Sequence, residues 1–144
     1  MIAGMLKVID GVTCNATATV YSSINSTFSQ TDAWIPCQSG ESFSIWVTAA
    51  SAGGTCNLDT YADLTPLGED IAYNSTDTSK YVSVKLDSSA LAADDTLTRY
   101  TSATLTNADL DYPFRKMRIR VVGSATNPAD TVVTVYLTRA NRWN

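Results

Sequence analysis

Residues Phe114–Arg139 read FRKMRIRVVGSATNPADTVVTVYLTR, and this stretch decides the fold class. It contains two runs in which apolar residues alternate with charged or polar ones, the period of a β-strand that buries one face. Between them, residues 123–130 contain glycine, asparagine and proline, which are typical of turns. The stretch therefore predicts a β-hairpin. Its predicted core residues are Met117, Ile119, Val121, Val133, Val135 and Leu137.

The rest of the chain shows the same pattern of short alternating runs separated by turn residues. In residues 42–49, Phe43, Ile45 and Val47 alternate with polar or aromatic neighbours. Residues 88–95 could hold one helical turn, because Ser88 can cap it and alanine and leucine favour helix. Seven to nine short strands without a long helix predict an all-β chain, a single antiparallel β-sandwich that is jelly-roll-like, with at most one short helical turn. The further strand candidates are residues 16–28, 33–36, 55–62, 81–86 and 96–106.

The length of 144 residues fits one domain with its own core. The first dozen residues have no obvious strand partner in the sequence. We therefore expect residues 1–15 to form an N-terminal arm that pairs on assembly, and residues 16–144 to form the β-sandwich domain.

Composition restricts the partners of the chain. Charged residues make up 17%, the net charge is −4, and serine and threonine are abundant. Nucleic-acid binding needs clustered cations, so we expect no nucleic-acid partner. No apolar run approaches about 18 residues, so we expect no membrane partner. No secretory signal is recognisable at the N-terminus.

The residues that usually carry enzyme chemistry are scarce. The chain has no histidine, which removes the commonest general base and most zinc sites. Cys14, Cys37 and Cys56 lack metal-ligand spacing, and their state as thiols or as one disulfide stays open. Residues 107–111 (NADLD) resemble the start of a calcium loop, but the glycine and glutamate that should follow are absent. We expect no enzyme, no cofactor and no metal site.

Two sets of side chains are candidates for an interface. Lys116, Arg118 and Arg120 share one strand face, where three cations must meet acids on a neighbouring strand or on a partner. Trp46 and Tyr136 occupy the polar sides of their strands, and Trp143 lies near the end of the chain. Outward aromatic residues suit burial within the domain, an interface with another chain or a sugar-stacking platform.

Four segments carry a family likeness. Residues 112–121 (YPFRKMRIRV) and 127–137 (NPADTVVTVYL), together with residues 43–49 (FSIWVTA) and 56–61 (CNLDTY), resemble virion structural proteins of tailed bacteriophages. The likeness covers roughly residues 42 to 139 and consists of an aromatic-led basic strand, a polar loop and a threonine/valine strand. It supplies no catalytic residue.

The resemblance implies a function. Proteins of this kind are small β-domains that decorate or cement capsid shells, or that form parts of tails and fibres. We therefore expect a capsid decoration protein that forms a homo-oligomer, contacts the major capsid protein or other virion proteins, and is assembled into virions in the host cytoplasm. The alternative is a tail or fibre component with a carbohydrate-binding face that uses Trp46 or Tyr136.

Overall fold

The structure is a computed structural model that describes residues 4–23, 33–37, 41–51, 56–87, 90–91, 98–101 and 114–141. These residues form ten strands and no helix, whereas the sequence predicts seven to nine strands and at most one short helical turn. The strands are β1 (Gly4–Thr13), β2 (Thr19–Tyr21), β3 (Ile35–Pro36), β4 (Glu41–Ala50), β5 (Cys56–Thr65), β6 (Val82–Asp87), β7 (Ala90–Leu91), β8 (Thr98–Thr101), β9 (Lys116–Gly123) and β10 (Val132–Asn141).

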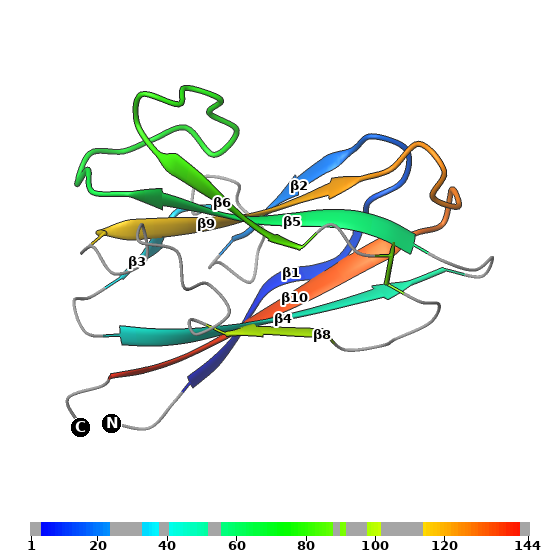
Figure 1. Cartoon of the computed structure of the whole chain (residues 1–144), viewed down its shortest axis with the longest axis horizontal. Helices are drawn as coiled ribbons and strands as arrows, with labels where there is room; N and C mark the ends of the chain where they lie inside the picture. The colour runs from blue at the N-terminus through cyan, green and yellow to red at the C-terminus, as the bar shows by residue number, and fades with distance from the viewer. Residues whose placement is uncertain are drawn as a thin grey trace.

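The strands form two antiparallel sheets packed face to face (Figure 1). Sheet A has the order β1-β10-β4-β8, and sheet B has the order β2-β9-β5-β6, with β3 added to β9 and β7 to β5. The pairs β1·β10, β2·β9, β4·β8 and β5·β6 are nested in the sequence, the first strand with the last and so on inward. A long antiparallel ribbon folded over in this way is a jelly roll, so the predicted fold class is confirmed.

The predicted hairpin in residues 114–139 is wrong. β9 pairs with β2, β3 and β5 in sheet B, whereas β10 pairs with β1 and β4 in sheet A. The loop between them crosses from one sheet to the other. Asn127 joins this loop to β5. Its Oδ1 accepts a hydrogen bond from Asn57 N–H at 2.7 Å, and its Nδ2 donates to Asn57 C=O at 2.9 Å. Alternation reports which residues face the core, and both strands have a core face, but it does not report which strands share hydrogen bonds.

The N-terminal segment is part of sheet A. Residues 4–13 form β1, which pairs with β10 from Gly4↔Arg139 to Thr13↔Val132, with irregular register near Ile9. The expectation that these residues lack a strand partner within the chain is therefore wrong. Their partner lies more than a hundred residues away in the sequence, so local pattern could not identify it.

The main core lies between the two sheets. All six predicted core residues of β9 and β10 are fully buried, and Phe43, Ile45, Val47 and Ala49 of β4 are buried with them. Val82 is 48% exposed, because β6 is the edge strand of sheet B and Val82 is its first residue. Of the segment predicted as a helical turn, Ala90–Leu91 forms β7; its other residues lie outside the described ranges.

Candidate functional site

The outer face of sheet B contains a buried ion pair between its two central strands. Arg118 on β9 stands opposite Asp63 on β5, and both side chains are 0% exposed. Arg118 Nε and Nη2 donate to Asp63 Oδ2 at 2.9 and 2.7 Å. Ionised groups removed from water are stable only when their charge and hydrogen-bonding atoms are matched, so this pair needs its surroundings.

Aromatic rings supply part of those surroundings. The guanidinium carbon of Arg118 lies 4.7 Å from the ring centre of Tyr21, 4.5 Å from Trp34 and 4.9 Å from Tyr81. Ring faces attract a cation, most strongly where water is excluded. Trp34, Tyr81, Ala33 and Ile71 form a second small apolar cluster. The outer face of sheet B thus has a core of its own.

The segment between β5 and β6, residues 66–81, covers this cluster, and we call it the strap. In Figure 1 it rises above sheet B on the side away from sheet A. Arg118 donates to two of its backbone carbonyls, Tyr73 C=O at 2.7 Å and Ser75 C=O at 3.0 Å. Trp34 Nε1–H donates to Ala72 C=O at 3.2 Å. The backbone carbonyls of the strap therefore accept hydrogen bonds from Arg118 on β9 and from Trp34, which precedes β3.

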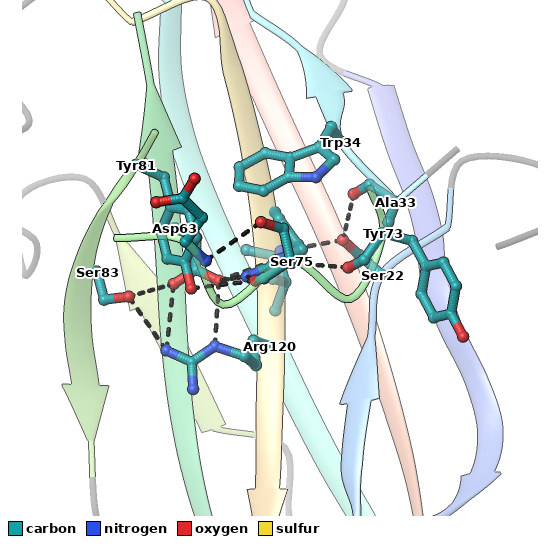
Figure 2. Close-up of polar contacts among 12 residues, drawn as sticks. Ser22, Ala33, Trp34, Asp63, Tyr73, Ser75, Tyr81, Ser83 and Arg120 are labelled. Carbon is teal, nitrogen blue, oxygen red and sulfur yellow. Dashed lines mark hydrogen bonds and ion pairs between the residues drawn. The ribbon is translucent and has the colours of Figure 1, made fainter. Parts of the chain in front are cut away.

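Arg120 extends the ion pair toward solvent. Its Nε donates to Asp63 Oδ2 at 3.1 Å, and its Nη2 donates to Ser83 Oγ at 3.1 Å, as Figure 2 shows. Ser83 in turn donates to Asp63 Oδ1 at 2.6 Å. Burial alone would lower the pKa of Arg120, but the hydrogen bond and charge of Asp63 outweigh it and raise that pKa. Asp63 thus forms ion pairs with both Arg118 and Arg120. We call Asp63, Ser83, Arg118 and Arg120 the Arg118 centre.

The outer face of sheet A has a different character. Trp46 on β4 and Tyr136 on β10 are register partners at the middle of a ten-residue ladder, and both are partly exposed. Trp46 Nε1–H donates to Thr138 Oγ1 at 3.2 Å, and Lys7 Nζ lies 5.5 Å from the ring centre of Tyr136. Partly exposed serine and threonine side chains surround the two rings. No described segment lies on the outer side of this sheet in Figure 1.

The structure separates the interface residues that the sequence nominated. Lys116, Arg118 and Arg120 lie on sheet B, whereas Trp46 and Tyr136 lie on sheet A, so the two sets point away from each other. The three cations meet acids of the same chain, since Lys116 Nζ lies 3.7 Å from Asp70 Oδ1. Arg118 has no exposed surface with which to touch a partner. Trp143 lies outside the described residues.

Sequence reasoning missed Asp63 and the strap. Asp63 lies between buried Ala62 and Leu64, just beyond the predicted end of the strand at residue 62. One signal could have identified Asp63. It is a carboxylate within a β-strand, in a chain that carries three cations on another strand. The strap gave none, because its mixture of turn residues and single apolar side chains resembles any surface loop.

The buried side chains of Arg118 and Asp63 have a structural role, because they join β9, β5 and the strap. Among the described residues no cluster of three metal-ligating side chains occurs, and no helix is long and apolar enough to cross a membrane. A pocket of about 510 Å³ lies beside β2 and the end of β1, but none of its described lining residues is charged. The NADLD segment at residues 107–111 lies outside the described residues.

The three cysteines form no disulfide with one another in the structure. Cys14 lies where the chain leaves β1, and it is fully buried. Burial, and to a smaller extent the neighbouring Cys56, raises the pKa of Cys14 to about 11. A thiol with such a pKa stays protonated at neutral pH and is a poor nucleophile.

No protein-family model matches the chain, and no curated protein matches it. Solved structures do. The chain is similar to the structure of infectious bursal disease virus, Gx strain, with a TM-score of 0.55, 11% identity and 98% of this chain covered. It is also similar to the VP2 subviral particle of infectious bursal disease virus, with a TM-score of 0.54, 11% identity and 99% coverage.

In both comparisons the chain spans 33% of the length of the other chain. At this identity the likeness concerns the fold, and it agrees with the nested strand order of the two sheets. The chain is an all-β protein whose two antiparallel sheets form a jelly-roll-like sandwich of the type found in viral capsid proteins.

Proposed function

We propose that this chain is a non-enzymatic structural protein of a virus particle, and that it decorates the outside of a bacteriophage capsid and stabilises contacts between its subunits. The observation that carries the proposal is the strand order, which aligns 98–99% of this chain with a third of a chain from virus particles. Its partners are the major capsid protein or other virion proteins, and its location is the virion, assembled in the host cytoplasm.

The surface of the molecule supports a role in assembly rather than in catalysis. The cations of sheet B are held by Asp63, Asp70 and the strap, so they contribute to the stability of the domain. The partly exposed aromatic pair on sheet A suits a protein contact, because tryptophan and tyrosine are enriched and charges are depleted at the centres of interfaces.

The proposal is tested by quantitative mass spectrometry of particles purified from the natural source of the chain. We expect a copy number in fixed proportion to the major capsid subunit. Particles that lack the chain should release their genome at a lower temperature than complete particles. Absence from particles, or only a few copies in each, would contradict the decoration role.

A second candidate is a tail or fibre component that binds carbohydrate. The adjacent rings of Trp46 and Tyr136 on a hydroxyl-rich face favour it, because flat rings can stack on sugars. A glycan array should then give saturable binding that is lost in Trp46→Ala and kept in Tyr61→Ala, a partly exposed aromatic residue on sheet B. Few copies per particle together with glycan binding would favour this candidate over decoration.

A further inference from the structure

We propose that the pocket between the end of β1 and the edge strand β2 is a binding site for a neutral saccharide. Its volume of about 510 Å³ lies within the range of about 300–1,000 Å³ that is usual for ligand pockets. The inference goes beyond the proposed structural role, which needs no such ligand. It also differs from the carbohydrate alternative above, because the pocket is lined by β1, β2 and the strap, whereas Trp46 and Tyr136 lie on β4 and β10.

The pocket exists because β1 bends away from β2. Ser23 N–H donates to Val8 C=O at 2.7 Å, but no ladder joins β1 to β2 among the described strands. Beyond Val8, the register of β1 with β10 is irregular, and Gly11 has a φ of 57°. A bulge bends the strand that contains it. Val12 and Thr13 therefore form one wall of the pocket, and β2 forms another.

The strap supplies a further wall, and the Arg118 centre holds it. Tyr73 and Asn74 line the pocket, and the Tyr73 ring lies edge-on to the Tyr21 ring with the ring centres 5.8 Å apart. Arg118 donates to Tyr73 C=O at 2.7 Å and to Ser75 C=O at 3.0 Å. These two bonds fix the backbone on both sides of Asn74. Figure 2 shows the Tyr73 ring pointing away from the Arg118 centre, so the ring is left for the pocket.

The lining of the pocket ranges from buried to exposed. Val20 and Ser22 are 7% and 1% exposed, whereas Thr13, Thr19 and Asn74 are exposed. A ligand can therefore enter from solvent at the exposed residues and contact groups that lie inside the molecule.

The groups that the lining offers determine the ligand class. No described lining residue is charged, so an ionic ligand would lose its hydration without meeting a counter-charge. Five lining side chains form no hydrogen bond within the described part of the chain: Thr13, Thr19, Tyr21, Tyr73 and Asn74. Their hydroxyl and amide groups both donate and accept, which matches the hydroxyls of a sugar. The ring of a tyrosine can also pack against the apolar face of a sugar ring.

The edge of β2 favours a compact ligand over an extended peptide. Ser22 N–H donates to β9, and Ala18 C=O accepts from β9. The backbone groups of Thr19 and Tyr21 therefore point the other way, along the free edge of β2. A peptide strand would need a longer row of such groups, but β2 has three residues, and Ser23 N–H is already bonded to β1. A single sugar ring needs no such row.

The test is an NMR titration of the isotope-labelled chain with neutral hexoses and N-acetylhexosamines, and with hexuronic acids as their charged counterparts, up to about 10 mM. We expect one neutral sugar to give saturable shifts at the amides of residues 19–23 and 73–74, and its acid to give none. The absence of saturable shifts overturns the inference. So do shifts confined to β4 and β10, or an acid that binds as tightly as the neutral sugar.

Variants of Tyr73 and Asn74 test the contacts directly. Tyr73→Ala removes the ring from the wall and should raise the dissociation constant of the sugar at least about ten-fold. Tyr73→Phe and Asn74→Ala each remove one polar group and should raise it about two- to five-fold. The matched control is Tyr136→Ala, the same change on sheet A, which should leave it unchanged. Circular dichroism and a thermal melt establish that each variant is folded.

Two outcomes of the variant series would overturn the assignment to this pocket. One is binding that Tyr136→Ala weakens as much as Tyr73→Ala does. The other is binding that neither Tyr73→Ala nor Asn74→Ala weakens. Asn74 is exposed, so its variant still gives an answer if Tyr73→Ala fails to fold.

Failure of this inference is separable from failure of the proposed function. A chain that binds no sugar but occurs in high copy number on particles would exclude only the saccharide site. A chain that binds a neutral sugar in this pocket but is absent from particles would exclude only the decoration role.

Discussion

The two outer faces of the sandwich differ in what stabilises them. On sheet B, Arg118 and Asp63 are fully buried, and the strap and three aromatic rings enclose them. On sheet A, Trp46 and Tyr136 are partly exposed among hydroxyls, with no charge on the central strands between residues 43–50 and 132–138. Charge on the central strands of sheet B lies under the strap, where each cation is matched, whereas on sheet A it lies on the flanking strands, at Lys7 of β1 and Arg99 of β8.

The largest expected effect is removal of the acid that both arginines share. Asp63→Ala leaves Arg118 buried without its counter-charge, which should lower the free energy of unfolding by about 3–5 kcal/mol. Denaturant unfolding measures it. The control is Asp59→Ala on the same strand, which removes only an exposed pair with Lys85 and should cost less than about 1 kcal/mol. Equal losses in the two variants would show that the Arg118 centre contributes nothing special.

Removing the cation as well should restore part of that loss. Arg118→Met keeps an unbranched side chain in the cage and leaves Asp63 bonded to Arg120 and Ser83, so we expect a loss of about 2 kcal/mol. The double variant Asp63→Ala/Arg118→Met should be more stable than Asp63→Ala alone, because no unpaired buried charge remains. Strictly additive losses in the double-mutant cycle would contradict this account.

Arg118→Met also tests whether the strap depends on this side chain. The substitution removes both donors to the carbonyls of Tyr73 and Ser75. Hydrogen exchange should then accelerate in residues 66–81 while the strands of sheet A keep their protection. Lys116→Met, on the same strand face but bonded to Glu69 at the strap edge, is the matched control and should change exchange little.

Alkaline pH should weaken the shared core without distinguishing the faces. The folded-state pKa of Cys14, about 11, lies above its ordinary value of 9.0, so the unfolded chain loses this proton first. The stability that Cys14 contributes is complete below about pH 9 and falls as the pH rises toward 11, by up to about 2 kcal/mol. Unfolding of Cys14→Ala should depend less on pH across this window. If the stability of the wild type and of Cys14→Ala depended on pH in the same way, the loss at alkaline pH could not be attributed to Cys14.

The sequence predicted the fold class well because the pattern of burial is local. Alternation in β4, β9 and β10 identified core residues such as Ile45, Ile119 and Val135. It could not identify strand partners, since Met117 and Leu137 have the same alternation but belong to different sheets. It also treated Arg118 and Tyr136 alike as outward residues. Arg118 alone is buried, by the rings of Tyr21 and Trp34 and by the strap, whose Tyr73 lies 45 residues from Arg118 in the sequence.

The smallest expected effect compares one threonine from each region. Thr48 Oγ1 on sheet A is buried without a hydrogen-bond partner, so Thr48→Val should be neutral or stabilise by up to about 1 kcal/mol. Thr65 Oγ1, at the end of β5, donates to Lys80 C=O at 2.7 Å and accepts from Leu67 N–H at 3.1 Å, which joins the two ends of the strap. Thr65→Val leaves both backbone groups unmatched and should cost about 1–3 kcal/mol.

Each valine variant removes one threonine hydroxyl, so the difference between their changes in stability measures how much each hydroxyl contributes to the fold. Thermal unfolding at one pH is sufficient, because neither threonine titrates. If Thr48→Val lost as much stability as Thr65→Val, the Thr48 hydroxyl would be bonded within the fold, and the contrast between these two threonines would fail. Opposite signs would mean that the Thr65 hydroxyl stabilises the domain through its two backbone partners, whereas the buried Thr48 hydroxyl costs stability.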